Sequence, residues 1–531
     1  MTEPSGGFAV VQALRDSGTD VVFGIPGTHN LEIYRHLFDS GIRHVAPRHE
    51  QGGGYAADGY ARASGRPGVL VTTSGPGLTN ACTPAATAYA DSVPMLLISP
   101  GVPRGMERAD LGWLHEMKDQ QAHLDCLVER SIRVASPQEA YQAITDTFAE
   151  WPSRRPRPVH VEIPVDVLEE AFDPGTLATT RLTPYAVREP SADELDRAAA
   201  VLADAESVLV IAGGGSRRAA EQLRELAEWL DAPVLTTVNG KGVLPERHPL
   251  ALGASLRLAE ARRIAEDVDV LLVVGTELGD SDLWGGRITR TGTVIRVDID
   301  ARQLQKNLAA DIALHGDADN VLREVFQRLA HRPRRAGLGR KAATLRDDID
   351  AAALVEGGPW RAVHDALVGA LPEDTIVAGD SAQVSYFGTV HQWPMSSVGQ
   401  FLYPTGFATL GYGLPAAIGA KLGCPDRPVI ALAGDGGTMF TVQEFMTAVD
   451  LGLPIPVIVM NNGGYGEIRD EMRNRGIVEQ AVTVRSPDFP ALARAFGGRG
   501  ERVTDPEHLA AAAAAALAAD GPTLLELPVV Q

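Results

Sequence analysis

The stretch Gly434-Asp435-Gly436-Gly437, followed by an apolar run that ends at Asn461-Asn462, decides the fold class of this chain. Between these motifs, residues 441–451 have the pattern of a helix and residues 455–460 that of a buried strand. A strand, a tight turn, a helix and a second strand place Asp435 and Asn462 at the same edge of a parallel sheet. Both offer hard oxygen ligands, which Mg2+ prefers, and the glycines let backbone N–H groups approach a phosphate.

Length and composition limit the classes of protein that fit this chain. Its 531 residues exceed what one hydrophobic core can serve and predict about three domains. The net charge is −20 without a long basic cluster, so we expect no nucleic-acid partner. We find no apolar run long enough for a bilayer and no signal-peptide pattern, and therefore expect a cytoplasmic protein without a membrane partner.

The three cysteines show no pattern that indicates metal binding or disulfide formation. Cys82, Cys126 and Cys424 are widely separated and have no paired metal-binding spacing. We expect them to be buried free thiols, neither metal ligands nor disulfide partners.

Strand and helix patterns alternate along the chain and predict an α/β protein built from three doubly wound parallel sheets. We expect a first domain over residues 1–172, a central Rossmann-like domain over 190–332 and a third domain over 345–531. A polar, Pro-containing passage at 173–193 and a basic stretch at 331–340 separate them. The expected strands are residues 21–23, 44–46, 69–71, 95–98, 159–163, 208–212, 270–274, 294–298, 375–378, 455–460 and 524–527.

A second constellation lies far upstream of the Asp435 motif. Arg48-His49-Glu50-Gln51-Gly52 precedes a helix of small residues at 56–63, and residues 73–80 contain the turn Ser74-Gly75-Pro76-Gly77. Taken singly, a His–Glu pair is more often a solvated helix end, and Gly-Asp-Gly is more often a simple acidic turn. The combination of the three motifs in one chain makes a shared site the better interpretation.

These motifs resemble the thiamine diphosphate signature and the pyrimidine-binding domain of the acetolactate synthase and 2-oxo acid decarboxylase superfamily. The resemblance covers essentially the whole chain in three-domain order: pyrimidine-binding, central and diphosphate-binding. It implies thiamine diphosphate and Mg2+ as cofactors and a small-molecule 2-oxo acid as substrate. It also implies a homodimer or homotetramer with active sites between subunits, because Glu50 and Asp435 lie on different domains.

The resemblance assigns roles to individual residues. Glu50 matches the catalytic glutamate that hydrogen-bonds N1' of the aminopyrimidine, so that the 4'-amine becomes an imine able to remove the C2 proton. An aspartate there would be about one methylene short of this contact. The implied Mg2+ ligands are Asp435, Asn462 and the backbone carbonyl of Gly464, and Leu410 matches the wedge between the cofactor rings. The other implied cofactor contacts are Ser381, Gln383, the Ala408 carbonyl, Gly434, Gly436, Gly437, Thr438 and Tyr465.

The substrate side is defined less sharply. By the same resemblance, His29 lies near the reactive carbon, where it could orient a carboxylate or move a proton. A structural histidine fits that position equally well. Gln121 matches an active-site glutamine, and Thr28 and His115 lie in segments that reach the same pocket in relatives.

Two features depart from the acetolactate synthases. Those enzymes carry a Gln-Trp pair after the Asn pair, where this chain has acids, and a C-terminal extension, whereas this sequence stops at Gln531. Residues 23–34 and 47–63 resemble 5-guanidino-2-oxopentanoate decarboxylase most closely. Glu467, Asp470 or Glu471 could then pair with a guanidinium tail, although each also fits a solvated helix face.

We therefore expect non-oxidative decarboxylation of a 2-oxo acid, giving an aldehyde or passing the enamine to a second carbonyl (carboligation). One alternative is an acetolactate synthase-type carboligase acting on pyruvate. Another is a flavin-linked oxidoreductase using the turn Gly213-Gly214-Gly215, but this turn lacks the full dinucleotide fingerprint, so FAD is not the expected cofactor. A non-catalytic homologue would normally lose Glu50, Asp435 or Asn462, and all three are present.

Overall fold

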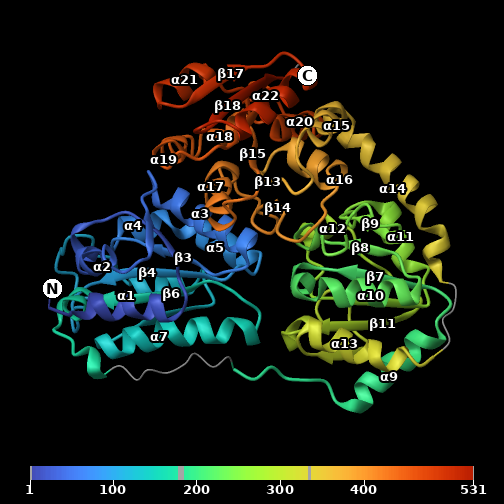
Figure 1. The fold of residues 1–531 in the computed structure, drawn as a ribbon, viewed down its shortest axis with the longest axis horizontal. Coiled ribbons are helices and arrows are strands. Elements are labelled where there is room, and N and C mark those ends of the chain that lie inside the picture. Colours follow the sequence, from blue (N-terminus) through green and yellow to red (C-terminus); the bar gives the residue numbers. More distant parts are fainter. Residues whose placement is uncertain (1–2, 177–184, 333–336, 530–531) are drawn as a thin grey trace.

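The computed structural model describes residues 3–176, 185–332 and 337–529. This part of the chain contains three parallel six-stranded sheets with flanking helices, which confirms the predicted α/β class with three doubly wound sheets. In Figure 1 the unit around the third sheet (orange to red) lies above the units around the first sheet (blue) and the central sheet (green). Within the described ranges, no helix is long and apolar enough to cross a membrane.

The first sheet has the strand order β2-β1-β3-β4-β6-β5. Its short, fully buried central strands are typical of a sheet covered on both faces. The strands are β1 (Val21–Gly24), β2 (Arg43–Val45), β3 (Gly68–Val71), β4 (Met95–Gly101), β5 (Arg130–Arg133) and β6 (Val159–Pro164). The helices are α1 (Gly6–Asp16), α2 (Leu31–Leu37), α3 (Glu50–Ser64), α4 (Pro76–Asn80), α5 (Cys82–Ala90), α6 (Gln120–Asp125), α7 (Pro137–Glu150) and α8 (Val165–Glu169), with a 3-10 turn η1 (Thr28–Asn30).

The central sheet has the order β12-β11-β10-β7-β8-β9. All its strands are parallel, and successive strands are added in one direction from β7 to β9 and in the other from β10 to β12. This is the strand order of the dinucleotide-binding folds. The strands are β7 (Val208–Ala212), β8 (Val234–Thr236), β9 (Ala251–Gly253), β10 (Val270–Val274), β11 (Thr293–Asp298) and β12 (Ile312–His315). The helices are α9 (Ala192–Asp204), α10 (Ala220–Leu230), α11 (Ala259–Glu266), α12 (Asp280–Leu283) and α13 (Ala318–Leu329), with η4 (Gly214–Ala219) after β7.

The third sheet, β14-β13-β15-β16-β18-β17, repeats the strand order of the first sheet. Its strands are β13 (Ile376–Gly379), β14 (Phe401–Leu402), β15 (Val429–Gly434), β16 (Pro456–Asn461), β17 (Arg499–Arg502) and β18 (Thr523–Pro528). Its helices are α15 (Arg361–Ala370), α16 (Val390–Gln392), α17 (Gly413–Gly423), α18 (Asp435–Thr438), α19 (Glu444–Asp450), α20 (Gly466–Asn474), α21 (Phe489–Ala495) and α22 (Pro506–Leu517), with the π-helix η9 (Val384–Thr389). Helix α14 (Ala342–Gly357) precedes them and packs on β9 and α11 of the central unit.

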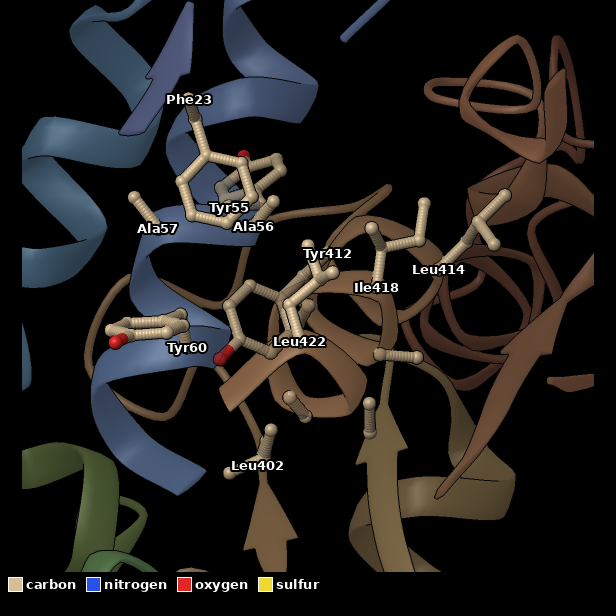
Figure 2. Close-up of a cluster of buried hydrophobic side chains, with 14 of the residues drawn as sticks. Phe23, Tyr55, Ala56, Ala57, Tyr60, Leu402, Tyr412, Leu414, Ile418 and Leu422 are labelled. Atoms are coloured by element: carbon tan, nitrogen blue, oxygen red, sulfur yellow. The ribbon is translucent and has the colours of Figure 1, made fainter. Parts of the chain in front are cut away.

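Helices α3 and α17 join the first and third units by direct packing. A Cβ atom on Gly59 would lie 2.2 Å from the Ala416 carbonyl oxygen, and one on Gly419 would lie 1.8 Å from that of Ala56, so only glycine allows this approach. Figure 2 shows the apolar cluster formed around the contact. The helix that begins at Glu50 is therefore held against the third unit of its own chain.

The structure differs from the sequence-based prediction in several elements. Every predicted strand is present, but the strands β5, β8, β9, β12, β14 and β17 were not predicted. The residues of β17, Arg499–Arg502, are polar and mostly exposed at a sheet edge, so they carry no strand pattern. The helix expected over residues 441–451 begins only at Glu444, after a turn. Residues 177–184 of the expected first linker and 333–336 of the second lie outside the described residues.

The prediction for the cysteines is correct in one respect and wrong in the other. All three are free thiols. Cys126, however, is exposed because it caps the C-terminus of the surface helix α6, and Cys82 and Cys424 are only half-buried. The wide spacing along the chain carried no information about burial.

Candidate active site

Glu50 is the first residue of α3 and is 8% exposed, so it is not a solvated helix end. The Asn80 side-chain amide donates a hydrogen bond to Glu50 Oε2 (3.0 Å). A Cβ atom on Gly77 would lie 3.1 Å from Glu50 Oε1, so the turn at residues 74–77 lies directly against the carboxylate. The structure thus brings together the two first-domain motifs that the sequence separates.

His29 lies on the other side of the same turn. Its Nδ1 is 2.6 Å from Ser74 Oγ, which is also 3.4 Å from His115 Nδ1. The two imidazole rings are 5.2 Å apart, edge to face. Burial and the neighbouring His115 lower the pKa of His29, so this imidazole is neutral at pH 7 and can accept a proton. Thr28, in the same 3-10 turn, is exposed.

A cavity of about 240 Å3 opens beside this histidine pair, and both His29 and His115 line it. Gln121 lines it as well, although its side-chain amide donates to the Ser131 carbonyl (2.9 Å). The neighbouring Gln120 accepts a hydrogen bond from Gly75 N (3.0 Å) and so fixes the turn. The predicted substrate-side residues of the first domain therefore share one cavity, except Thr28.

The Asp435 motif forms a second polar group at the carboxyl edge of the third sheet. Asp435 is buried, and its carboxylate accepts from Ser486 Oγ (2.6 Å) and Asn462 N (3.3 Å). A Cβ atom on Gly436 would lie 3.4 Å from the Gly464 carbonyl oxygen and 2.9 Å from the Tyr465 ring. The residues predicted as Mg2+ ligands thus lie together, and Thr438 Oγ1 is bound to the Gly434 carbonyl (2.8 Å).

The donors in this group are hard oxygens, which fits the chemistry of Mg2+. The described residues contain no cluster of three or more His, Cys, Asp and Glu side chains able to hold a metal. A cation there would need phosphate or water oxygens beside one carboxylate, an amide and a carbonyl, which is the usual state of protein-bound Mg2+.

The loop after β13 and the loop before α17 meet at Asp380. Its buried carboxylate accepts from Ser381 N (2.8 Å) and Gly411 N (3.0 Å), and burial raises its pKa to about 6. A Cβ atom on Gly437 would lie 3.1 Å from Asp380 Oδ2 and 3.5 Å from the half-buried Leu410. The predicted wedge residue therefore lies beside the predicted phosphate turn.

Ala408 has a left-handed backbone, with φ of +50°, and is exposed. For a residue other than glycine this conformation is strained, and such strain is concentrated at functional sites. Ala408 N donates to the Pro404 carbonyl (2.7 Å), which holds the bend.

The acids of α20 fall into two groups. Glu467 and Asp470 both accept from the Gln383 side-chain amide (2.9 and 3.1 Å), beside the loop after β13. Glu471 instead pairs with Arg475 at 2.7 Å on the outside of the helix. The structure thus places Glu467 and Asp470, but not Glu471, next to the predicted cofactor residues.

Comparison with known proteins agrees with this arrangement. Residues 4–123, 195–325 and 381–527 match the N-terminal TPP binding, central and C-terminal TPP binding domains of the thiamine pyrophosphate enzymes. The chain is 42% identical to a probable 2-ketoarginine decarboxylase of Pseudomonas aeruginosa over 98% of its own length and 94% of the relative's. This chain belongs to the thiamine pyrophosphate enzymes.

Acetolactate synthases are also similar along the whole length of this thiamine pyrophosphate enzyme. A probable large subunit from Methanocaldococcus jannaschii is 32% identical over 98% of the chain and 91% of the relative. The large subunit of Escherichia coli isozyme 3 is 32% identical over 95% of the chain and 91% of the relative. The chain therefore falls within the group that holds the 2-oxo acid decarboxylases and the acetolactate synthases.

Sequence reasoning missed several residues that shape this thiamine pyrophosphate enzyme's site. Glu444 Oε1 accepts from the backbone N of Arg48 and His49, next to Glu50. The sequence indicated Glu444 only as a charged residue within the mainly apolar residues 438–449. Asn80 and Ser486 gave no signal, because their partners are distant in sequence.

The central domain of the enzyme also has a hollow at the carboxyl edge of its sheet. A cavity of about 180 Å3 there adjoins a larger one of about 830 Å3 that reaches Ala408. Two of the three glycines of the Gly213 turn are nevertheless required by packing: Cβ atoms on Gly213 and Gly215 would meet the Gly275 backbone at 2.4 and 2.9 Å. These glycines therefore give no separate argument for a bound flavin.

Proposed function

We propose that this chain is a thiamine diphosphate- and Mg2+-dependent decarboxylase of a 2-oxo acid, with 2-ketoarginine as the first candidate substrate. The observation that carries the proposal is the full-length match to the probable 2-ketoarginine decarboxylase, combined with a buried Glu50 against the turn at residues 74–77. Thiamine diphosphate, when bound, would supply an electron sink for release of carbon dioxide.

Glu50 is the proposed proton-transferring residue, acting through its carboxyl group on N1' of the cofactor. Asn80 holds Oε2 and leaves Oε1 beside Gly77, so the carboxyl group has a fixed orientation. A fixed carboxyl group loses less entropy on forming the productive contact.

Asp435, Asn462 and the Gly464 carbonyl would hold Mg2+, with the diphosphate near Gly434, Gly436, Gly437 and Thr438. Ser381, Gln383 and Tyr465 are proposed as further contacts of the cofactor, which is supported by the position of Tyr465 against Gly436 and of Ser381 next to Asp380, which lies against Gly437. Leu410 is the proposed wedge, and the Ala408 carbonyl the proposed acceptor from the 4'-amine. His29, neutral at pH 7, would orient the substrate carboxylate or move a proton, with His115 and Gln121 in the same cavity.

We propose that the active sites lie between two subunits, in a homodimer or homotetramer. In this chain the contacts of Glu50 are with Asn80 and Gly77, whereas Asp435 contacts Ser486 and Asn462. Each carboxylate is thus held by its own domain. In a dimer, the surface around Glu50 of one copy would meet the surface around Asp435 of the other.

A second candidate is acetolactate formation from pyruvate, favoured by the full-length matches to acetolactate synthases. The purified protein, supplied with thiamine diphosphate, Mg2+ and a panel of 2-oxo acids, separates the two when products are identified by mass spectrometry. Release of the guanidino aldehyde supports the first candidate, and acetolactate from pyruvate supports the second.

Glu50→Gln tests the mechanism common to both candidates. The amide cannot take part in the proton transfer, so turnover should fall by about 10²- to 10⁴-fold. Cofactor binding, measured by calorimetry, should change little because Gln keeps the size and one acceptor. Near-normal turnover in Glu50→Gln would refute the role of this residue.

A further inference from the structure

The cavity beside His29 extends along the carboxyl edge of the first sheet. Gly101 ends β4, Arg133 ends β5 and Glu162 lies in β6, and all three line the cavity. Its volume of about 240 Å3 suits a small metabolite and not a macromolecular segment. The carboxyl edge of a doubly wound sheet is where such folds bind ligands.

Two carboxylates share one arginine in the wall of this cavity. Arg133 Nη2 donates to Glu107 Oε1 (2.6 Å) and to the Val102 carbonyl (2.7 Å), and its Nη1 is bound to Glu162 Oε1. The group therefore carries one negative charge more than Arg133 neutralises. The other charged pair in the wall, Arg108 with Asp119, is balanced.

The second carboxylate oxygen of Glu162, Oε2, is buried and has no hydrogen-bond partner within the described part of the chain. Gln120 approaches the same carboxyl group, but its amide already donates to Ser99 Oγ (3.3 Å) and to the Pro100 carbonyl (2.8 Å). Burial raises the pKa of Glu162, and Arg133 opposes the rise. An unmatched buried carboxylate oxygen is costly unless a ligand supplies the missing donor.

We propose that Glu162 Oε2 receives the tail of the substrate, and that this tail is a guanidinium group. The inference rests on the proposed function and adds the residue that selects the substrate. A guanidinium group has only donors and one positive charge, which complements both the free oxygen and the excess charge. A ureido tail of the same shape is neutral and would turn its own oxygen toward a carboxylate in one orientation.

The acids of α20 are the competing receptor for the tail. Glu467 and Asp470 already accept from Gln383, and Tyr386 approaches Glu467. Their acceptor capacity is partly used, and they lie by the predicted diphosphate residues of the third domain. Glu162 shares its cavity with His29, the residue proposed to face the reactive carbon.

The test compares kcat/KM for 5-guanidino-2-oxopentanoate and 5-ureido-2-oxopentanoate in the wild type, in Glu162→Gln and in Glu467→Gln. The ratio of the kcat/KM values for the two substrates, measured in one preparation, is unaffected by partial loss of folded protein. We expect the wild type to favour the guanidino acid by about 10- to 100-fold and Glu162→Gln to lose most of this preference. Glu170→Gln, another Arg-paired glutamate but outside the cavity lining, should keep it.

Three results would overturn the assignment. Equal kcat/KM for both substrates in the wild type would show that no residue recognises the charge of the tail. Retention of the preference in Glu162→Gln together with its loss in Glu467→Gln would move the receptor to α20. If no 2-oxo acid releases carbon dioxide in a thiamine diphosphate-dependent way, the proposed function fails and the inference fails with it. Decarboxylation without a preference for the guanidino acid refutes only the inference.

Discussion

Glu444 Oε1 lies 3.0 Å from His49 N, so a carboxylate of the third domain caps the helix that begins at Glu50. The same oxygen accepts from Arg48 N at 3.1 Å, and the Glu444 side chain is buried. A negative group is favourable at a helix N-terminus, where N–H groups lack intrahelical partners. The position of Glu50 thus depends on a contact between domains of one chain.

This contact predicts the effect of Gly52→Ala. The new Cβ atom would lie 2.4 Å from Glu444 Cδ, inside van der Waals contact. We expect a loss of stability of about 1–3 kcal/mol from this overpacking, and lower turnover because Glu50 is displaced. Gln51→Ala, which removes only a 3.4 Å contact with Tyr55, is the control and should be close to wild type in thermal unfolding and in activity. Equal stability of both variants would show that Glu444 can move aside.

A second prediction concerns Asp435. Asp435→Ala removes the carboxylate proposed to hold Mg2+, so the affinity for thiamine diphosphate should fall by at least about tenfold in the presence of Mg2+. Calorimetric titration of the cofactor with and without Mg2+ measures this. Ser486→Ala, which loses only the hydrogen bond to Asp435, should weaken binding less. Unchanged Mg2+-dependent affinity in Asp435→Ala would contradict the proposed metal site.

A third prediction concerns Arg62, which joins all three domains. Its guanidinium donates to Asp58 (2.6 Å) and Asp91 (2.8 Å) of the first domain. It also donates to Asn239 Oδ1 of the central domain (3.0 Å) and to the Tyr403 carbonyl of the third (3.1 Å). Arg62→Met would remove the ion-pair partner of two buried carboxylates, at a cost of about 3–5 kcal/mol. Asp91 also accepts from Gly406 N, so the bend at Ala408 should loosen and cofactor affinity fall.

Arg66→Met is the matched control for Arg62→Met. Arg66 follows α3 and pairs with Asp20 at the solvent-exposed surface. An exposed ion pair contributes about 1 kcal/mol or less to the free energy of unfolding. Midpoints of thermal unfolding for the two variants should therefore differ by several degrees. Similar midpoints would show that the Arg62 network contributes no more than a surface pair.

The fourth prediction is a dependence of stability on pH. Burial lowers the pKa of His160 from 6.5 to about 3 and that of His364 to about 4. Between about pH 6.5 and 4 these histidines take up protons in the unfolded chain but not in the folded one. The free energy of unfolding should therefore fall with falling pH, by about 1.4 kcal/mol per pH unit for each histidine.

His364→Gln separates this effect from other acid-linked losses. The wild-type imidazole is bound to the Trp360 carbonyl (2.8 Å) and to Thr389 Oγ1 (3.0 Å), which an amide can partly replace. The variant should be less stable at pH 7.5 but lose less stability on going to pH 5. Parallel pH profiles of the unfolding midpoint would contradict the lowered pKa.

The parts of the fold that sequence predicted are those with strong local patterns. Unbroken apolar runs such as residues 270–274 and 208–212 became central strands of a parallel sheet. The edge strand β17, Arg499–Arg502, has no such pattern, because pairing with β18 alone makes it a strand. The strand order of each sheet and the packing of α3 on α17 depend on contacts far apart in the sequence.

The same distinction applies to the site. Glu50, Asp435 and Asn462 were predicted as site residues because a few residue types recur at these positions in a known family. Glu162, the proposed receptor of the substrate tail, was not predicted, because an unmatched buried oxygen in a cavity wall leaves no local pattern in the sequence. Glu471 was named beside Glu467, but the helical turn places it on the outer face with Arg475.

The central claim is that Glu50 of one subunit acts on a cofactor held by Asp435 of another. Inactive Glu50→Gln and Asp435→Ala proteins, unfolded together, refolded and assayed for carbon dioxide release, test it most directly. If sites lie between subunits, each hybrid dimer has one intact site, and a statistical mixture recovers about a quarter of wild-type activity. If both residues serve a site within one chain, every site in the mixture carries a mutation, and the mixture remains as inactive as its parents.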